Sequence, residues 1–279
     1  MTRQQAKTTA RRIIQQCRQT SWRLRSLPDF IIIGAQKSGT TSLYSCLGQH
    51  PQIFPPDRKE IHYFDGGRHP GTDNYEKGEK WYRAHFPLRM SMSDGDRAFE
   101  ASPLYMFNPL VPERIFNLLP RARLIAILRN PTERAISHYF HEKRKGRESL
   151  PIMEAMLQEE QRLASAIACK DYGSTDFRHF SYKLRGMYRQ QLEGFFRYFS
   201  RQQVLVLGSD EFFGKPDETL EKVFEFVGVD AGFRAATTRL RNVGTNKSEI
   251  SPDVYDYLND YFLPHNEALY ELLGERYEW

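Results

Sequence analysis

The sequence predicts an α/β protein with a single three-layer domain, in which helices flank a central parallel sheet. Short runs of apolar and β-branched residues, such as Phe30–Ile33, recur along the 279-residue chain, and buried parallel strands have this composition. Between these runs lie longer segments whose apolar residues recur every three or four positions, which is typical of amphipathic helices. Strands that alternate with helices favour parallel pairing, with helices on both faces of the sheet.

Four segments have the composition of strands: 29–35, 97–103, 122–131 and 203–212. The first helix is expected at 40–51, where apolar residues share one face and Gly48 and Pro51 end the pattern. A proline near its start and another after its end mark a helix at 111–120. Further helices are expected at 132–146, 150–167, 184–200, 216–229 and 251–274, the last as a pair broken at Pro264.

The domain organisation is simple. Residues 66–95 are polar and rich in glycine, with isolated aromatic residues, so we interpret them as an excursion near the active face rather than a separate domain. The chain contains no internal repeat and no low-complexity linker. We therefore expect one domain over residues 28–279, preceded by a basic arm over residues 1–27.

The basic arm carries the positive charge of the chain. The formal net charge is +5, yet the arm has seven arginines and lysines and no acidic residue, while the rest of the chain holds 33 basic and 35 acidic residues. Such an arm fits a targeting peptide, a segment that binds anionic surfaces, or a solvated helix docked through Ile13, Ile14 and Cys17. No run of about 18 apolar residues occurs, so we expect no transmembrane segment. Without an anchor or paired cysteines, a cytoplasmic protein is expected, although the arm leaves organelle targeting open.

The cysteines and histidines give no strong metal signal. The three cysteines, Cys17, Cys46 and Cys169, form no disulfide framework, and neither C-x-x-C nor H-E-x-x-H occurs. His138 and His141 are three residues apart on an expected helix, a spacing that permits metal ligation. Because no third ligand lies nearby in the sequence, we expect no metal site.

The segment "GAQKSGTTS" between the first strand and the first helix is the most informative part of the chain. A nucleotide-binding P-loop has the pattern G-x-x-x-x-G-K-[ST]. Gly34 and Gly39 have this spacing, but Thr40 stands where the lysine belongs, and the lysine is displaced to Lys37. The backbone of such a turn still directs N–H groups at an anion. We therefore expect a P-loop-like domain whose loop holds a single phosphate, rather than an ordinary strand-to-helix turn; its donors are Lys37, Ser38, Gly39, Thr40, Thr41 and Ser42.

The stretch "QKSGTTSL" resembles the 5′-phosphosulfate loop of sulfotransferases that use 3′-phosphoadenosine 5′-phosphosulfate (PAPS). A second stretch, "LRNPTERAISHYFH", resembles the family's segment in which an arginine and a serine bind the 3′-phosphate. The resemblance implies these roles for Arg129 and Ser137, PAPS as the donor, 3′-phosphoadenosine 5′-phosphate (PAP) as the product, and no required metal. Near the C-terminus the family usually has Lys-Gly-Arg, but this chain has Val243-Gly244-Thr245. The remaining candidates for the 3′-phosphate are Thr245, Asn246 and Lys247.

The stretch "RKEIHYFD" resembles the heparan sulfate, or carbohydrate, branch of this family, in which the glutamate is the general base. By position this residue is Glu60. Such a base is needed because the acceptor loses a proton as it attacks sulfur. The leaving group is a phosphate oxygen, and we expect Lys37 to stabilise the charge that develops on it. The alternative is that Glu60 merely forms a surface ion pair with Lys59 or Arg58.

Other residues of these segments are candidates for supporting roles. His62 is a second base or an orienting group, and Asp65 holds either His62 or the acceptor. Tyr105 belongs to "FEASPLYMF" and Tyr188 to "RGMYRQQLEGFFRYF", both of which resemble family segments. Tyr188 either faces the site or packs in the core, since an aromatic residue on a striped helix does both equally often.

The sequence thus favours a sulfotransferase that moves a sulfuryl group to a hydroxyl, or an amine, of a carbohydrate or a small natural product. A P-loop kinase that uses ATP is the first alternative, but the Walker lysine is absent and the strand before Arg129 ends without a magnesium-binding aspartate. The second alternative is a non-enzymatic polyanion binder that uses the basic arm. The expected partner is a small molecule or a glycan and no nucleic acid, and the sequence gives no oligomeric state.

Overall fold

The computed structural model describes residues 15–236 and 250–279. Its strands form one five-stranded sheet in the order β2-β3-β1-β4-β5, and every pairing is parallel. The predicted α/β fold with a central parallel sheet is confirmed. The strands are β1 (Phe30–Gly34), β2 (Ile53–Phe54), β3 (Arg97–Ala101), β4 (Arg123–Leu128) and β5 (Val204–Gly208).

The central strand β1 lies between β3 and β4. Ile31 is in register with Glu100 on one side and with Leu124 on the other. Because all strands run in the same direction, the segments that follow β1, β3 and β4 emerge side by side at one edge of the sheet. This edge is where ligands bind in open parallel sheets.

Eleven helices have described bounds, together with five short 3-10 turns. The helices are α2 (Thr40–Leu47), α3 (Gly78–Arg83), α4 (Val111–Leu118), α5 (Pro131–Arg144), α6 (Ile152–Leu157), α7 (Glu159–Ala168), α8 (Thr175–His179), α9 (Tyr188–Phe196), α10 (Ser209–Gly214), α11 (Pro216–Val227) and α12 (Pro252–Leu273). The turns are η1 (Trp22–Leu24), η2 (Asn74–Lys77), η3 (Arg89–Ser91), η4 (Leu184–Gly186) and η5 (Arg201–Gln203).

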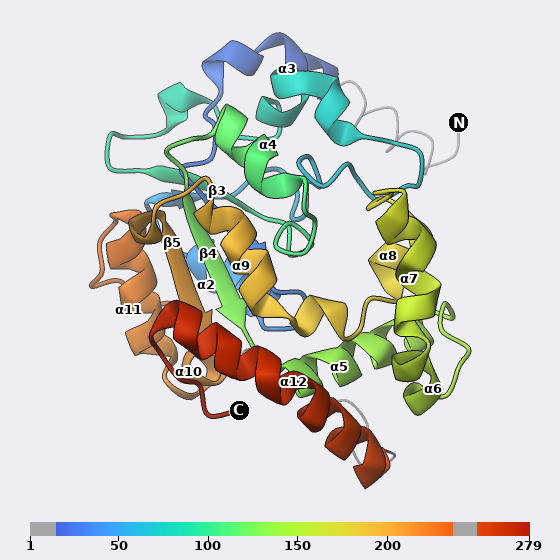
Figure 1. Ribbon diagram of the computed structural model, residues 1–279. Helices are drawn as coiled ribbons and strands as arrows, with labels where there is room; N and C mark the ends of the chain where they lie inside the picture. Colours follow the sequence, from blue (N-terminus) through green and yellow to red (C-terminus); the bar gives the residue numbers. More distant parts are fainter. Residues whose placement is uncertain (1–14, 237–249) are drawn as a thin grey trace.

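The two faces of the sheet are covered by different helices. Ile31 and Ile33 of β1 belong to one core with residues of α4, α9 and α12, whereas Ile32 belongs to a second core with residues of α2, α10 and α11. This division follows from the strand itself, since successive side chains point to opposite faces. Figure 1 shows α9 and α12 in front of the sheet, and α5 to α8 gathered beyond its lower right end.

Helix α5 connects this group to the sheet. It begins directly after β4 with Asn130 as its N-cap, whose side chain accepts a hydrogen bond from the Glu133 backbone N–H. Its buried residues Ala135 and Ile136 belong to a third core, to which α6 and α12 contribute. This packing fixes the start of α5 at the same edge of the sheet as the end of β1.

Several predicted elements differ in extent from the observed ones. The helix expected over 150–167 is two helices, α6 and α7, which meet at Gln158. The strand expected over 203–212 ends at Gly208, after which α10 begins. The segment 184–200 contains a 3-10 turn before α9, and neither the two-residue strand β2 nor the five-residue helix α8 was predicted.

Helix α12 corrects the prediction of a helix pair, because it continues through Pro264. An internal proline costs roughly 3 kcal/mol. Buried residues on both sides of it, including Leu258 and Leu269, pack into the cores. This packing outweighs the local cost, since tertiary contacts supply most helix stability in proteins.

The described end of the basic arm contacts the domain. The guanidinium of Arg18 donates to the Ala84 carbonyl at 2.6 Å, and that of Arg25 donates to the Phe86 carbonyl at 2.8 Å. The contacted segment belongs to the excursion 66–95, whose helix α3 lies at the top of Figure 1, at the end of the molecule opposite α5. Only the start of the excursion, at Arg68, reaches a cavity described below. Among residues 15–236 and 250–279, no helix is long and apolar enough to cross a membrane.

Candidate active site

The loop after β1 leaves several backbone N–H groups without a capping side chain. Gly39 is the N-cap of α2 with φ 105°, a conformation that favours glycine, and it offers no side chain to cap the helix. The first backbone N–H groups of α2 therefore keep their capacity for an external acceptor. Lys37 at the tip of the loop also has a left-handed backbone, with φ 73°.

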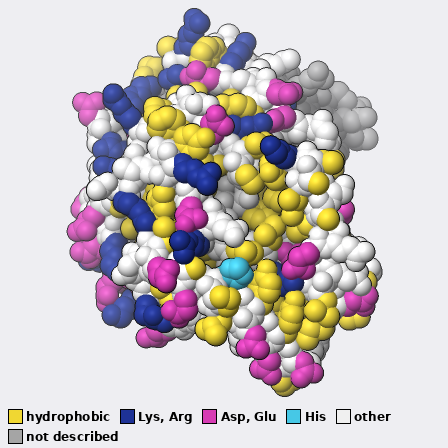
Figure 2. Space-filling model, in the orientation of Figure 1, with side chains coloured by type: hydrophobic (Ala, Val, Ile, Leu, Met, Phe, Trp, Pro, Cys, Tyr) yellow, Lys and Arg dark blue, Asp and Glu magenta, His cyan; other side chains and the backbone are white. Residues whose placement is uncertain are grey.

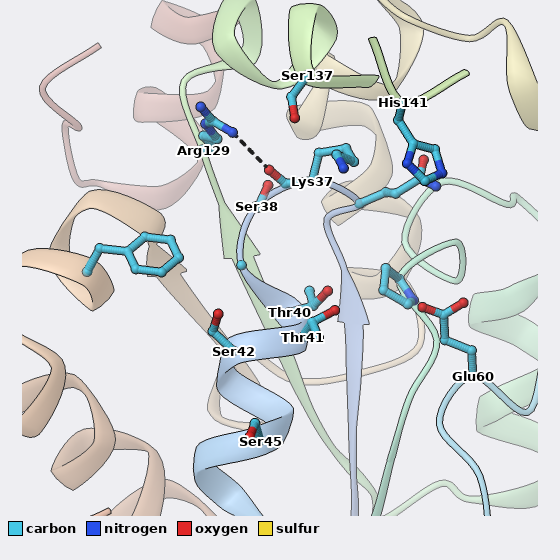
Figure 3. Close-up of a pocket in the computed structure, with 14 residues that line it drawn as sticks. Lys37, Ser38, Thr40, Thr41, Ser42, Ser45, Glu60, Arg129, Ser137 and His141 are labelled. Atoms are coloured by element: carbon cyan, nitrogen blue, oxygen red, sulfur yellow. Dashed lines mark hydrogen bonds between the residues drawn. The ribbon is translucent and has the colours of Figure 1, made fainter. Parts of the chain in front are cut away.

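A cavity of about 650 Å³ opens over this loop. It unites nine residues that the sequence predicted for the site, namely Lys37, Ser38, Gly39, Thr40, Thr41, Ser42, Glu60, Arg129 and Ser137. Figure 3 shows Arg129 and Glu60 on opposite sides of the cavity, with Lys37 between them and Ser137 directed inward from α5. The three motifs, which are far apart in the sequence, thus meet in one place.

Lys37 lies in a strongly positive environment. Burial lowers the pKa of its ammonium, and the nearby Arg144, Arg129 and Arg134 lower it further. Within the described residues, no carboxylate lies within ion-pair distance of Lys37. A group of cations with this deficit of counter-charge is suited to a polyanion.

Arg129 is fixed at the end of β4 by three contacts. Its guanidinium donates to the Lys37 carbonyl at 3.3 Å and forms an ion pair with Glu133 at 3.1 Å. Its own carbonyl accepts a hydrogen bond from the Tyr188 hydroxyl at 2.8 Å. The side chain is thus oriented along the loop, where a guanidinium can bind phosphate oxygens in bidentate fashion.

Arg134 was not predicted, although it lies on α5 between Arg129 and Ser137. Its side chain is completely buried, and its Nε and Nη1 have no hydrogen-bond partner in the described structure. It donates to the Tyr182 carbonyl. Burial lowers its pKa, which shows that the fold holds a charge here at a cost. This buried charge contributes to the positive potential at Lys37.

Glu60, His62 and Asp65 form a connected row. The His62 Nδ1 lies 2.6 Å from Asp65 Oδ2, and its Nε2 lies 3.3 Å from Glu60 Oε2. Burial opposes the charged form of His62, but the two carboxylates outweigh it and raise its pKa. The two carboxylates thus favour the charged form of His62, which holds its proton to a higher pH than a free histidine does.

Glu60 is ionised and surrounded by cations. Besides His62, it contacts Lys59 at 3.0 Å and Arg68 at 2.8 Å. Burial alone would raise the pKa of Glu60, but the hydrogen bond from His62 and the Lys59 ammonium outweigh it and hold the pKa well below its usual value. Glu60 therefore forms the ion pair with Lys59 that the sequence allowed as its alternative role, and it also lines the cavity.

The backbone holds these side chains in an unusual conformation. Glu60 has φ 61° and His62 has φ 54°, although neither is glycine. The Glu60 N–H donates to the Ala101 carbonyl at 3.1 Å, and the His62 N–H donates to Ser102 Oγ at 3.3 Å. Left-handed residues of this kind are uncommon and cluster at functional sites. The end of β3 thereby determines where Glu60 lies.

A second cavity, of about 270 Å³, adjoins the first. The two share four lining residues, Gln36, Glu60, Pro103 and His141. The second cavity is lined further by His62 and by several basic residues from the end of α5 and from α8. The shared wall means that a molecule beside Glu60 has access to both spaces.

Three predicted substrate-binding residues line neither cavity. Asp65 is buried beneath His62. Tyr105 is 0% exposed and donates to Glu100 at 3.2 Å, and Tyr188 is 1% exposed and holds Arg129. Direct contact with an acceptor is therefore not expected of them; they support neighbouring residues. The candidates Thr245, Asn246 and Lys247 lie outside the described residues.

The cavities also contain residues that were not predicted for the site. His141 lines both cavities and follows Ser137 by one helical turn, a spacing that could have indicated it. Phe213 approaches Gly39 from α10, and no motif marks it. The structure does not bring His138 to the cavities; it is completely buried in α5 and uncharged, because burial holds its pKa well below the usual value. In the described ranges, no group of three or more His, Cys, Asp or Glu residues is arranged so that it could hold a metal ion.

Comparison with known proteins identifies the class. A sequence model of the sulfotransferase domain matches residues 27–248, which is most of the chain. The chain therefore belongs to the sulfotransferase family, which is a family of enzymes. The sulfotransferase from Alicyclobacillus acidocaldarius has a known crystal structure and is 30% identical, with a TM-score of 0.69 over 90% of this chain and 98% of that one.

Two curated relatives show the range of the likeness. Bifunctional heparan sulfate N-deacetylase/N-sulfotransferase 2 of Mus musculus is 31% identical over 276 residues, which is 89% of this chain and 30% of that protein. Membrane-associated sulfotransferase kil1 of Dictyostelium discoideum is 24% identical over 332 residues, which is 94% of this chain and 69% of that protein. The chain thus spans less than a third of the length of the bifunctional relative.

Proposed function

We propose that this sulfotransferase takes its sulfuryl group from PAPS and transfers it to a hydroxyl or an amine of an acceptor. One observation carries the proposal: a single cavity of about 650 Å³ is lined both by the anion-binding loop with Lys37 and by Glu60. A donor at the loop and a nucleophile beside Glu60 would lie in the same cavity. Such proximity is a large part of catalysis in group transfer.

The donor supplies an activated sulfuryl group, and the residues of the chain bind both of its ends. The N–H groups at the start of α2 and the hydroxyls of Thr40 and Ser42 are suited to the 5′-phosphosulfate. On the other side of the loop, Arg129 and Ser137 are suited to the 3′-phosphate, as in the family that the motifs resemble. No residue of this set calls for a metal ion.

Glu60 and Lys37 divide the proton and charge transfer. As the acceptor oxygen or nitrogen forms its bond to sulfur, its proton passes to the Glu60 carboxylate. The bond between sulfur and the phosphate oxygen breaks, and Lys37 and the N–H groups of α2 stabilise the charge that develops on that oxygen. The products are the sulfated acceptor, PAP and a proton on Glu60, so the step is balanced.

His62 acts in this scheme as an orienting group. Both of its ring nitrogens face carboxylates, Nδ1 that of Asp65 and Nε2 that of Glu60, so neither is free to accept the acceptor's proton. Its ring instead links buried Asp65 to Glu60 and holds the carboxylate toward the cavity. Of the two roles that the sequence left open for His62, this geometry favours orientation.

The acceptor class is proposed from the relatives. One relative is named for N-sulfation of heparan sulfate, so a carbohydrate is the first candidate and an amine remains a possible nucleophile. A small natural product is the second candidate. Membership in the sulfotransferase family favours this reading over an ATP kinase or a polyanion binder without activity.

Calorimetric titration tests the donor. PAP is titrated without metal, and ATP is titrated with magnesium in parallel. We expect PAP to bind with micromolar or tighter affinity and ATP to bind at least tenfold more weakly. Binding of ATP alone would overturn the proposal and favour the kinase. Binding of neither nucleotide would also overturn the proposal, because PAPS would then not be the donor.

A further inference from the structure

The second cavity is more basic than the site of transfer requires. Five arginine and lysine side chains line it, against the two carboxylates of Glu60 and Glu142; the five are Arg68, Lys145, Arg147, Arg178 and Arg185. On the face of the molecule in Figure 2, basic and acidic side chains are largely interspersed. The cavity therefore has a larger excess of basic over acidic side chains than that surface has.

The two carboxylates are already engaged. Glu142 pairs with Arg147 at 2.8 Å and with His179 at 3.2 Å. Glu60 pairs with Lys59, His62 and Arg68. Three cations of the cavity remain, and among the described residues no carboxylate lies within ion-pair distance of Lys145, Arg178 or Arg185.

Arg185 is a fixed positive charge. It is 3% exposed and lies 4.8 Å from the Phe107 ring centroid. It donates to the hydroxyl of Ser181 at 2.7 Å and to the carbonyl of Arg178 at 2.7 Å. Burial and the nearby Arg134 lower its pKa to about 9. Neutral partners satisfy its hydrogen bonds but leave its charge uncompensated, and such a charge favours an anion nearby.

Arg178 has unused donor capacity. Its Nη1 donates to the Gly67 carbonyl at 2.5 Å, which orients the side chain. Its Nε is buried and has no hydrogen-bond partner in the described structure. A buried donor without a partner costs about 1–3 kcal/mol. Lys145, just beyond the end of α5, adds an exposed ammonium to the lining of the cavity.

We propose that this cavity is an acceptor subsite for a compact anionic group, so that the enzyme sulfates acceptors that already carry a carboxylate or a sulfate ester. The inference rests on the proposed function, because Glu60 on the shared wall is the point at which the nucleophile would lie. The acceptor would place its hydroxyl or amine beside Glu60 and its negative charge among Lys145, Arg178 and Arg185.

The size of the cavity limits what enters it. Its volume of about 270 Å³ is at the small end for ligand pockets, so one ring with a charged substituent suits it better than an extended chain. Among the described residues of its lining, only Pro103 and Leu104 are apolar. A lipid or a neutral aromatic acceptor would bury the three unpaired cations without compensation, which disfavours it.

A matched pair of sugars tests the subsite. The probes are a tetrasaccharide of alternating glucuronate and N-acetylglucosamine, and the same tetrasaccharide with its carboxylates reduced to alcohols. Each is titrated calorimetrically into the full chain saturated with PAP. We expect the acidic sugar to bind at least tenfold more tightly than the reduced one. The preference should fall severalfold in Lys145→Met and further in Arg178→Met. Lys80→Met, an exposed lysine of α3 outside both cavities, should leave it unchanged.

The outcomes separate this inference from the proposed function. PAP affinity is measured first for every variant; it tests the donor site and shows that each variant is folded. Equal affinity for the two sugars, including no measurable binding of either at millimolar concentration, would overturn the subsite while the donor proposal stands. An acidic preference that Lys145→Met and Arg178→Met leave intact would also overturn it, because the preference would then arise elsewhere on the surface.

Discussion

Glu60 pairs with three cationic side chains, which fix the position of its carboxylate but lower its basicity. Lys59, His62 and Arg68 keep the carboxylate ionised and lower its pKa. A base with a low pKa removes a proton less readily. The Arg68 side chain is 57% exposed, and an acceptor that displaces it would return part of the basicity. In the proposed mechanism, Glu60 would thus be positioned before the acceptor arrives and would become more basic once Arg68 is displaced.

Replacement of Glu60 tests its role as the base. Glu60→Gln keeps the shape of the side chain but cannot accept the proton. We expect kcat to fall by roughly 10²–10⁴-fold, with PAP affinity unchanged within about threefold, because the glutamine leaves the loop intact. The measurement is transfer from PAPS to an accepted sugar, with PAP titration alongside. Glu113→Gln, an exposed glutamate of α4, is the control and should retain full activity. Activity of Glu60→Gln close to the control would exclude Glu60 as the base.

Replacement of Arg129 tests the 3′-phosphate assignment. A hydrogen bond to a charged group contributes about 1.5–3 kcal/mol, so Arg129→Ala should weaken PAP binding at least tenfold. Adenosine 5′-phosphate, which lacks the 3′-phosphate, should lose no more than about twofold. Because Arg129 also donates to the Lys37 carbonyl, equal losses for the two nucleotides would instead indicate that it only supports the loop. Exposed Arg197→Ala serves as the control.

At the scale of elements, the loop between β1 and α2 depends on one backbone conformation. Gly39 has φ 105°, and a Cβ added there would lie 3.0 Å from the Phe213 ring. Gly48 at the other end of α2 has φ −67°, within the range of any residue. The same substitution at the two ends of one helix therefore separates the strained position from the ordinary one.

We expect Gly39→Ala to lower the free energy of unfolding by about 1–3 kcal/mol and to weaken PAP binding at least tenfold, because the N–H groups of α2 would be reoriented. Gly48→Ala should change stability by less than about 1 kcal/mol and leave PAP binding unchanged. Urea denaturation and calorimetry measure the two effects. Similar PAP affinity in the two variants would show that the left-handed turn is not required for the anion site.

The arrangement of strands and helices determines how much of the site could be predicted from the sequence. The loop and the Arg129 and Ser137 pair each follow a strand that the sequence predicted. Parallel strands bring such segments to one edge, so the meeting of these two was predictable. Glu60 lies in a motif that only its family resemblance marked, because the short strand β2 before it was not predicted. The second cavity was not predictable, because Arg68, Lys145 and Arg178 come from separate loops and helices with no motif between them. The continuity of α12 through Pro264 likewise depends on packing that no local pattern shows.

At the scale of the whole molecule, the buried carboxyl groups include two whose pKa is raised to about 7 by burial. Glu100 is 0% exposed and accepts hydrogen bonds from Tyr82 and Ser102, yet burial raises its pKa to about 7. Glu159 is 1% exposed, and burial raises its pKa to about 7 as well. The domain boundary at residue 28 and the cytoplasmic location stay predictions, but these buried groups make the stability of the fold open to a direct test.

A buried acid with a raised pKa makes stability depend on pH in a definite direction. Between its unfolded value of 4.5 and its folded value of about 7, Glu100 is protonated in the folded state and ionised in the unfolded state. The folded state then binds more protons, so the free energy of unfolding falls as pH rises through this window and levels off above it. Each group contributes on the order of 3 kcal/mol at most over that interval.

Isosteric variants isolate this contribution from that of other groups. Glu100→Gln and Glu159→Gln remove the ionisation, so their stability relative to the unsubstituted protein should rise between pH 5 and pH 8. Exposed Glu225→Gln should show a constant difference over the same range. Urea denaturation at pH 5, 6, 7 and 8 provides the free energies. A difference for Glu100→Gln that is independent of pH would mean that Tyr82, Ser102 and Tyr105 stabilise its carboxylate enough to offset burial. The carboxyl would then be ionised in the folded core throughout.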